Sequence, residues 1–303
     1  MHVLRTATAL ILAAVGAALT AEAQDLEPRA FTNTPVGLNF LILGYGHTQG
    51  DVAFDTSLPI KDAELTVNGV VLAYARSLDV WGRAGKFDAV LPFASLNGIA
   101  KVFGQPAERQ VSGLGDPRLR FSVLWYGAPA LTLEEFASYQ ADLIIGTSLA
   151  VTLPLGQYDT HKLVNIGTHR WSFKPEVGVS KTLGPWTLEL EASATFYTDN
   201  DDFFIHRTLH VDPLYAVQGH AIYHTRFGVW LAADVTYYAG GKATVDGEEG
   251  ERQENVRVGG TIAIPVNRYN SVKIFGSTGA VARVGGSFNT IGIAWQYRWG
   301  GGL

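Results

Sequence analysis

Charged side chains recur at alternate positions in many strand-length stretches of this 303-residue chain. A β-strand sends successive side chains to opposite faces, so each stretch has one polar and one apolar face. Unpaired charges are costly in a dry interior, so these groups must be ion-paired or hydrated. We expect the following residues to line a polar lumen: Lys86, Asp88, Arg118, Arg120, Asp142, Lys174, Glu176, Glu189, Glu191, His220, Asp234, Arg257 and Lys273.

A wet lumen lined by both signs of charge is what a channel requires. Because the signs are mixed, such a channel would select only weakly by charge. The alternative is a ladder of charges that braces a blocked interior. The sequence leaves both interpretations open for each residue.

Histidines close to hydroxyl groups suggest an enzyme as a further hypothesis. A serine–histidine dyad for lipid hydrolysis needs both side chains within hydrogen-bond reach. His220 and His224 share the strand face of Gln218, which we assign to the lumen rather than to lipid. His206 and His210 lie in a loop that contains no serine. We therefore expect no enzyme.

Motifs that hold cofactors or metals are absent from the sequence. It contains no phosphate-binding glycine loop, dinucleotide fingerprint, H-E-x-x-H or G-x-S-x-G motif, and no cysteine. The run Asp199-Asn200-Asp201-Asp202 could hold Ca²⁺ but lacks the spacing of an EF-hand. We interpret it, and the run Gly247 to Glu251, as solvated loops that could bridge to lipopolysaccharide through divalent cations. We predict no cofactor and no metal.

The elements that carry these residues are predicted strands. Trp186 to Phe196 shows the pattern best, with apolar residues at every even position and polar ones at every odd position. We expect twelve strands: 36–46, 65–76, 80–91, 117–126, 140–152, 169–181, 186–198, 213–225, 227–238, 255–264, 271–282 and 288–299. Most reach the length of about 9–11 residues that crosses a membrane. Around Val70-Val71-Leu72 the faces cannot be assigned.

Connections between the predicted strands alternate in length. Short turns are expected at 77–79, 183–185, 226–227 and 267–270, and long polar loops near 47–64, 93–116, 154–168, 199–212 and 240–254. Outer-membrane barrels have short periplasmic turns, long outer loops and both termini in the periplasm. Two connections fit this scheme less well, because 127–138 is long for a turn and 283–287 is short for an outer loop.

The chain ends support export to an outer membrane. Met1 to Ala23 is typical of a secretory signal peptide, with Arg5 before an apolar stretch and the cleavage site Ala21-Glu22-Ala23. We therefore expect residues 24–303 to form one domain. The last predicted strand places Ile291, Ile293, Trp295, Tyr297 and Trp299 on one face, which is typical of an interfacial aromatic girdle.

Overall composition also favours a membrane barrel over a soluble protein. Charged residues make up only 17% of the chain, aromatic residues 11%, and there are 34 glycines. A soluble sandwich would have strands of about half the predicted length. A lipocalin-like barrel would use only about eight strands. The net charge of −5 gives no indication of nucleic-acid binding.

Several short motifs resemble one known family. Ser112-Gly113-Leu114-Gly115-Asp116-Pro117-Arg118-Leu119 contains the G-L-G-D-P motif of outer-membrane proteins associated with the meta-pathway of phenol degradation. Further similar segments are 171–176, 184–186, 196–200, 212–215, 237–241 and 296–299. The resemblance covers the whole mature chain. It implies an outer-membrane barrel that admits aromatic or other apolar small molecules, and it supplies no binding residues.

We therefore predict an all-β protein with one antiparallel transmembrane barrel of about twelve strands in a bacterial outer membrane. It would act as a passive channel for small solutes and contact outer-membrane lipids and lipopolysaccharide. An energy-coupled receptor would need a plug domain, for which residues 24–35 are too few. A structural or adhesive barrel with an occluded lumen is the alternative. The oligomeric state and the solute remain open.

Overall fold

The computed structural model describes residues 27–53, 60–102, 105–282 and 285–303. The predicted signal peptide, Met1 to Ala23, lies outside these described residues. Among them, no helix is long and apolar enough to cross a bilayer.

The long strands follow the alternating segments of the sequence. They are β1 (Leu38–Ala53), β2 (Ile60–Val80), β3 (Arg83–Val102), β4 (Gln105–Leu114), β5 (Arg118–Tyr126), β6 (Leu143–Thr152), β7 (Ser172–Leu183), β8 (Trp186–Tyr197), β11 (Leu214–His224), β12 (Trp230–Gly240), β15 (Gln253–Pro265), β16 (Asn270–Ala282) and β17 (Gly285–Gly300). Four short strands are β9 (Asn200–Phe203), β10 (Arg207–Val211), β13 (Ala243–Val245) and β14 (Glu248–Glu249), and α2 spans Leu133–Phe136.

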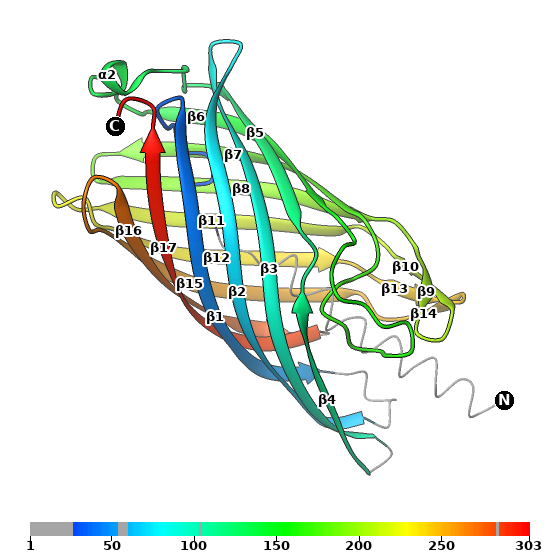
Figure 1. The fold of residues 1–303 in the computed structure, drawn as a ribbon. Helices are drawn as coiled ribbons and strands as arrows, with labels where there is room; N and C mark the ends of the chain where they lie inside the picture. Colours follow the sequence, from blue (N-terminus) through cyan, green and yellow to red (C-terminus); the bar gives the residue numbers. More distant parts are fainter. Residues whose placement is uncertain (1–26, 54–59, 103–104, 283–284) are drawn as a thin grey trace.

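The long strands close into a barrel. Within the described residues they form one 13-stranded antiparallel sheet, which the pairing of β2 with β3 closes. β1 and β17 pair along their whole length, from Leu38 opposite Gly300 to Ala53 opposite Gly285. β4 and β5 both pair with β3 and form two halves of one wall strand, so the barrel has 12 strands. The predicted fold class is confirmed (Figure 1).

The apolar faces of the strands point away from the barrel. On β8, Leu188 and Leu190 are 45% and 60% exposed, whereas Glu189 and Glu191 are 4% and 3% exposed. A large exposed apolar surface is unfavourable in water and favourable against hydrocarbon. The exterior of the barrel is therefore suited to lipid.

Aromatic residues of β17 extend this apolar exterior. Trp295, Tyr297 and Trp299 are exposed and stack in a row, with ring centroids 6.2 Å and 5.6 Å apart. Amphipathic rings of this kind are enriched where a barrel meets the membrane interface. The row indicates where one interface crosses the barrel.

The two ends of the barrel differ. At the turn end, strands are joined by short links such as 81–82 and 184–185, and this end also carries α2 and the C-terminus (Figure 1). The connection predicted at 127–138 runs from 127 to 142 and contains α2, whose N-cap Thr132 accepts a hydrogen bond from the Glu135 amide. At the loop end, β9, β10, β13 and β14 form a separate four-stranded sheet.

Three predicted connections were wrong. The stretches 47–64 and 93–116 are largely strand, because β1 with β2 and β3 with β4 continue as paired ribbons. The predicted turn at 77–79 belongs to β2, and the chain reverses instead at Trp81 and Gly82, both with positive φ. The polar composition of these segments predicted loops, in which water would bind the backbone N–H and C=O groups. Pairing with a neighbouring strand satisfies the same backbone groups equally well.

The Gly115-Asp116-Pro117 motif breaks the wall strand between β4 and β5. The amide of Gly115 donates to the Pro92 carbonyl at 2.9 Å. The Asp116 carboxylate accepts hydrogen bonds from the Gly156 amide at 2.8 Å and from the Thr168 amide and hydroxyl at 2.7 Å each. The motif therefore ties the strand break to the loop between β6 and β7.

A charge placed on the outer face tests this orientation. We expect Leu190→Lys, near the middle of β8, to lower the free energy of unfolding in liposomes by about 2–4 kcal/mol, since a cation there would enter hydrocarbon. Leu155→Lys, at a 66% exposed position in a loop, is the matched control and should have little effect. Equal effects in urea titrations would contradict the assignment of the outer face.

Candidate functional site

The segment that precedes β1 lies inside the barrel. The amide of Arg29 donates a hydrogen bond of 2.7 Å to the Glu189 carboxylate on β8, and the Thr32 hydroxyl donates one of 3.4 Å to the same carboxylate. We call residues 27–37 the N-terminal plug. It spans part of the lumen and is held by side chains of the opposite wall.

A single aromatic side chain fixes the plug to the wall. Phe31 is 1% exposed and packs with Ala84, Leu124, Ala128 and Ile144. Its ring also fills the space over Gly146 and Gly178, where an added Cβ would lie 2.7 Å and 2.2 Å from ring atoms. These two glycines of β6 and β7 form a cradle for Phe31, since larger residues would occupy the same volume.

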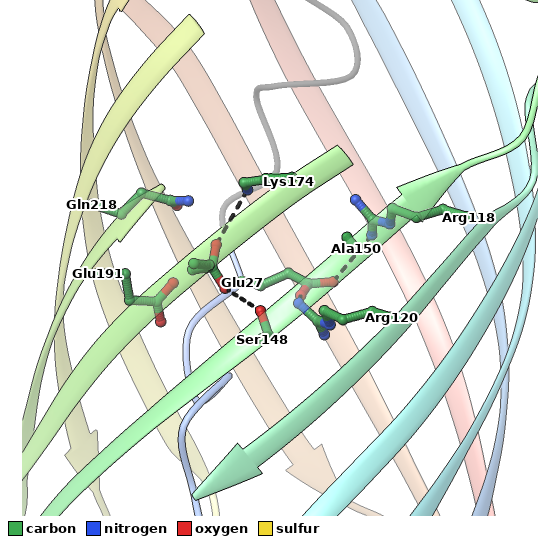
Figure 2. Close-up of a pocket in the computed structure, with 9 residues that line it drawn as sticks. Glu27, Arg118, Arg120, Ser148, Ala150, Lys174, Glu191 and Gln218 are labelled. Atoms are coloured by element: carbon green, nitrogen blue, oxygen red, sulfur yellow. Dashed lines mark hydrogen bonds and ion pairs between the residues drawn. The ribbon is translucent and has the colours of Figure 1, made fainter. Parts of the chain in front are cut away.

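Glu27, the first residue of the N-terminal plug, contacts a group of cations on the barrel wall. Figure 2 shows its carboxylate between Arg118 and Arg120 of β5. One oxygen contacts Nη1 of Arg120, and the other lies 3.6 Å from Nη2 of Arg118. Arg120 Nε also donates to Asp88 at 3.0 Å, and Lys86 Nζ lies 3.6 Å from Asp88. We call Lys86, Arg118 and Arg120 the cation group.

The cation group determines the ionisation of Glu27. Burial by itself raises the pKa of the Glu27 carboxyl, but Arg120, Arg118, Lys86 and Lys273 together outweigh burial and hold this pKa well below its ordinary value. Glu27 is therefore an anion over the whole physiological pH range.

The neighbouring wall carries further paired charges. Lys174 Nζ lies 3.3 Å from Glu176, which also accepts a hydrogen bond of 3.1 Å from the Ser148 hydroxyl (Figure 2). These side chains reach the lumen from β6 and β7 and lie beside Glu27 and Glu191. Charges of both signs are thus neutralised within one wall.

A buried trio continues this wall. His220 Nδ1 lies 2.6 Å from an oxygen of Asp234, and its Nε2 lies 3.9 Å from Glu191. All three side chains are nearly inaccessible, at 3% exposure or less for each side chain. These three side chains therefore fill this sector of the lumen.

An open cavity lies on the other side of the plug. It has a volume of about 700 Å³ and is bounded by the plug, the cation group and the inner faces of β1, β2, β16 and β17. The lining from β1 and β2 is largely apolar, with Phe40, Ile42, Ala73 and Ala75, whereas β16 and β17 contribute Lys273, Gln296 and Arg298 beside Ala294. The lumen therefore has a charged, packed side and an open side that is apolar along β1 and β2.

The structure places the remaining sequence-predicted residues at three further positions. Lys273 lines the open cavity. Arg257, 8% exposed, donates to the hydroxyls of Ser277 at 3.0 Å and Thr290 at 2.9 Å. Asp142 lies apart from the others at the turn end, where its 75% exposed side chain pairs with Lys181 at 2.5 Å.

Sequence reasoning missed Glu27, Phe31 and the glycine cradle. The segment 24–35 is too short for a plug domain, and a short irregular segment has no periodic pattern that would place it inside a barrel. The one available signal was glycine at interior positions of β6 and β7, since glycine in a strand often marks a close approach by another part of the chain.

Two carboxylates of the acidic run 199–202 form ion pairs with the nearby histidines His206 and His210. Asp199 lies 2.6 Å from His210, and Asp202 lies 2.5 Å from His206. Within the described residues, no cluster of three or more such side chains could hold a metal ion. The ring nitrogen Nε2 of His224 lies 3.1 Å from the hydroxyl of Thr187, so the hydroxyl that it contacts is that of a threonine and not of the serine that a serine–histidine dyad needs.

These features define the chain as an outer-membrane β-barrel with a charged lumen and an internal N-terminal plug. Residues 45–283 match the family described as "Putative MetA-pathway of phenol degradation", and the chain belongs to this family. No curated protein sequence matches it significantly.

Solved structures share this fold at low sequence identity. The crystal structure of the COG4313 outer membrane channel from Pseudomonas putida F1 superposes with a TM-score of 0.79 and 21% identity, covering 91% of this chain and all of that one. The β domain of the Bordetella autotransporter BrkA has a TM-score of 0.53 and 13% identity over 87% of this chain and all of that one. The transport unit of autotransporter AIDA-I from Escherichia coli also scores 0.53, with 9% identity, over 92% of this chain and 95% of that one.

Filling the glycine cradle should release the plug. We expect Gly178→Ala to expel Phe31, since overpacking of a tight contact costs about 1–3 kcal/mol. The chain has no cysteine, so Ala30→Cys supplies a unique thiol beside Phe31. Maleimide labelling should be several times faster with Gly178→Ala than without it. Gly69→Ala is the matched control, because its added Cβ meets nothing closer than 3.9 Å; equal rates in both variants would contradict the cradle.

Acid should weaken the plug only at low pH. A carboxyl whose pKa is lowered by folding stabilises the folded arrangement above its ordinary pKa, and this contribution is lost as the pH falls through the lowered value. A spin label at Pro28→Cys should therefore stay immobile through mildly acidic pH and become mobile only in strong acid. With Glu27→Gln it should be mobile throughout; an identical pH response in both variants would exclude Glu27 as the anchor.

Proposed function

We propose that the protein is a passive outer-membrane channel for small apolar or aromatic solutes. Solute would enter among the loops, pass along the apolar side of the lumen and leave at the turn end. The observation that carries this proposal is the cavity of about 700 Å³ between the plug and the inner faces of β1, β2, β16 and β17. It lies within the volume range of small-molecule sites, roughly 300–1,000 Å³.

The chemistry of this cavity supports apolar solutes. Phe40, Ile42, Ala73 and Ala75 offer contacts for a hydrocarbon or aromatic body. Membership of a family described by phenol degradation agrees with this choice. The structure with the TM-score of 0.79 is itself described as a channel, which supports the same function here.

The orientation in the membrane is part of the proposal. We place the turn end and both chain ends in the periplasm and the loop end outside, as in other barrels of this kind. The signal peptide would be removed after Ala23 during export. Loop carboxylates at the outer end would face lipopolysaccharide and its divalent cations.

A barrel with an occluded lumen is the second candidate. The plug favours it, because Glu27, Arg29 and Phe31 all bind to the wall. The two functions differ in whether the plug leaves a route open or moves to provide one.

Current through single barrels distinguishes the two. We expect the mature chain to give stepwise currents in planar bilayers, and removal of residues 24–34 to raise the conductance severalfold because it clears the lumen. Folding of both proteins is checked by their heat-modifiable mobility on gels. Silence from both folded proteins would instead support the structural barrel.

A further inference from the structure

Two exposed histidines lie side by side at the loop end of the barrel. His161 belongs to the loop between β6 and β7, and His206 lies in the turn between β9 and β10. Their ring centroids are 6.2 Å apart, with an interplanar angle of 78°. The two side chains are 73% and 72% exposed, so an ion in the surrounding solution has access to both rings.

The backbone holds the two loops together at this point. The Ile205 amide donates a hydrogen bond of 2.7 Å to the Thr160 carbonyl, and each of these residues directly precedes one of the two histidines. Leu163 and Phe204 pack against the same buried cluster of the small four-stranded sheet. The fold of both loops therefore places the two rings next to each other.

The turn that carries His206 has an unusual backbone. Phe204, Ile205 and His206 have positive φ angles of 29°, 61° and 59°. Residues other than glycine rarely adopt this left-handed region, and strained segments of this kind cluster at functional sites. Burial of Ile205 does not explain the turn, since this side chain is 59% exposed. The turn has this shape at the place where it brings His206 beside His161.

A carboxylate lies beside one nitrogen of each ring. Nδ1 of His206 lies 2.5 Å from Asp202. Nδ1 of His161 lies 3.5 Å from Asp159, and 3.4 Å from the hydroxyl of Thr160. A neutral imidazole that donates its Nδ1–H to such a group carries its lone pair on Nε2. Histidines that bind metals through one ring nitrogen commonly donate the other to a carboxylate, so both rings have the surroundings of a metal ligand.

We propose that His161 and His206 form a binding site for a divalent transition-metal ion such as Zn²⁺, which the Nε2 atoms of both rings would coordinate. Imidazole suits Zn²⁺, Cu²⁺ and Ni²⁺, whereas Ca²⁺ and Mg²⁺ prefer oxygen ligands. Zn–N bonds of about 2.0–2.1 Å require the rings to approach each other slightly, which their exposure allows. In the described part of the chain no group of three or more candidate ligands is present, so water would complete the coordination.

The bound ion would link the β6–β7 loop to the β9–β10 turn at the loop end. This site lies outside the lumen, and it does not depend on the proposed channel function. Sequence analysis predicted no metal, because the two histidines lie far apart in the chain and only the folded loops bring them together.

Calorimetry on the folded barrel in detergent, purified without a histidine tag, tests the site. The probes are zinc chloride and calcium chloride. We expect a single Zn²⁺ to bind and Ca²⁺ at equal concentration not to displace it. His161→Ala and His206→Ala should each weaken Zn²⁺ binding by about tenfold or more, and Asp202→Asn, which removes only a carboxylate partner, by about tenfold.

His210→Ala is the matched control. His210 also lies at the loop end, but its Nδ1 lies 2.6 Å from Asp199 and its Nε2 lies 3.6 Å from Asp212, so both ring nitrogens face carboxylates. This variant should bind Zn²⁺ as the unaltered protein does. Heat-modifiable mobility on gels checks that each variant is folded.

Electron spin-echo measurements on the barrel loaded with Cu²⁺ count the coordinated imidazoles. We expect two imidazoles in the unaltered protein and one in either His161→Ala or His206→Ala. One imidazole or none in the unaltered protein would overturn the inference. Displacement of Zn²⁺ by Ca²⁺, weakening in only one of these two alanine variants, or an equal loss with His210→Ala would overturn it as well.

Discussion

Neutralisation of charge inside the barrel is the constraint on which the rest of the structure depends. The outer faces of the strands are apolar, so ionisable side chains on the same strands turn inward, where each requires an opposite charge or a hydrogen bond. Arg120 with Asp88 and Glu27, Lys174 with Glu176, and His220 with Asp234 meet this requirement. The plug takes part in this balance, because the Glu27 carboxylate contacts Arg118 and Arg120 of β5.

The same balance divides the lumen into two sides. Side chains of β5, β6, β7, β8, β11 and β12 pair with one another and fill their sector, as the buried His220, Asp234 and Glu191 illustrate. β1 and β2 contribute small or apolar side chains such as Ile42 and Ala73, β16 and β17 contribute Lys273 and Ala294 among others, and these four strands leave a cavity. The charged side is thus packed, whereas the other side leaves a cavity of about 700 Å³.

The barrel could be predicted from the sequence because apolar and polar residues alternate with a period of two along each strand. Leu188, Leu190, Glu189 and Glu191 lie on the faces that alternation assigns to them. The extensions of β1 to β4 could not be predicted, since polar residues beyond the membrane resemble loop whether or not their backbone is paired. Most predicted lumen residues lie near one another, but their partners Glu27 and Phe31 come from a segment without periodicity, and long-range contacts of this kind leave no local pattern.

The location of the plug beside the closing seam constrains how the chain can fold. The plug leads directly into β1, and β1 joins β17 along the seam where the first and last strands meet. Phe31 reaches its cradle on β6 and β7, across the lumen from that seam. Either the plug is already inside when the two terminal strands pair, or it enters the closed barrel afterwards through one of its ends. The closure of the wall therefore divides the possible folding routes into two, according to whether Phe31 reaches β6 and β7 before or after β1 pairs with β17.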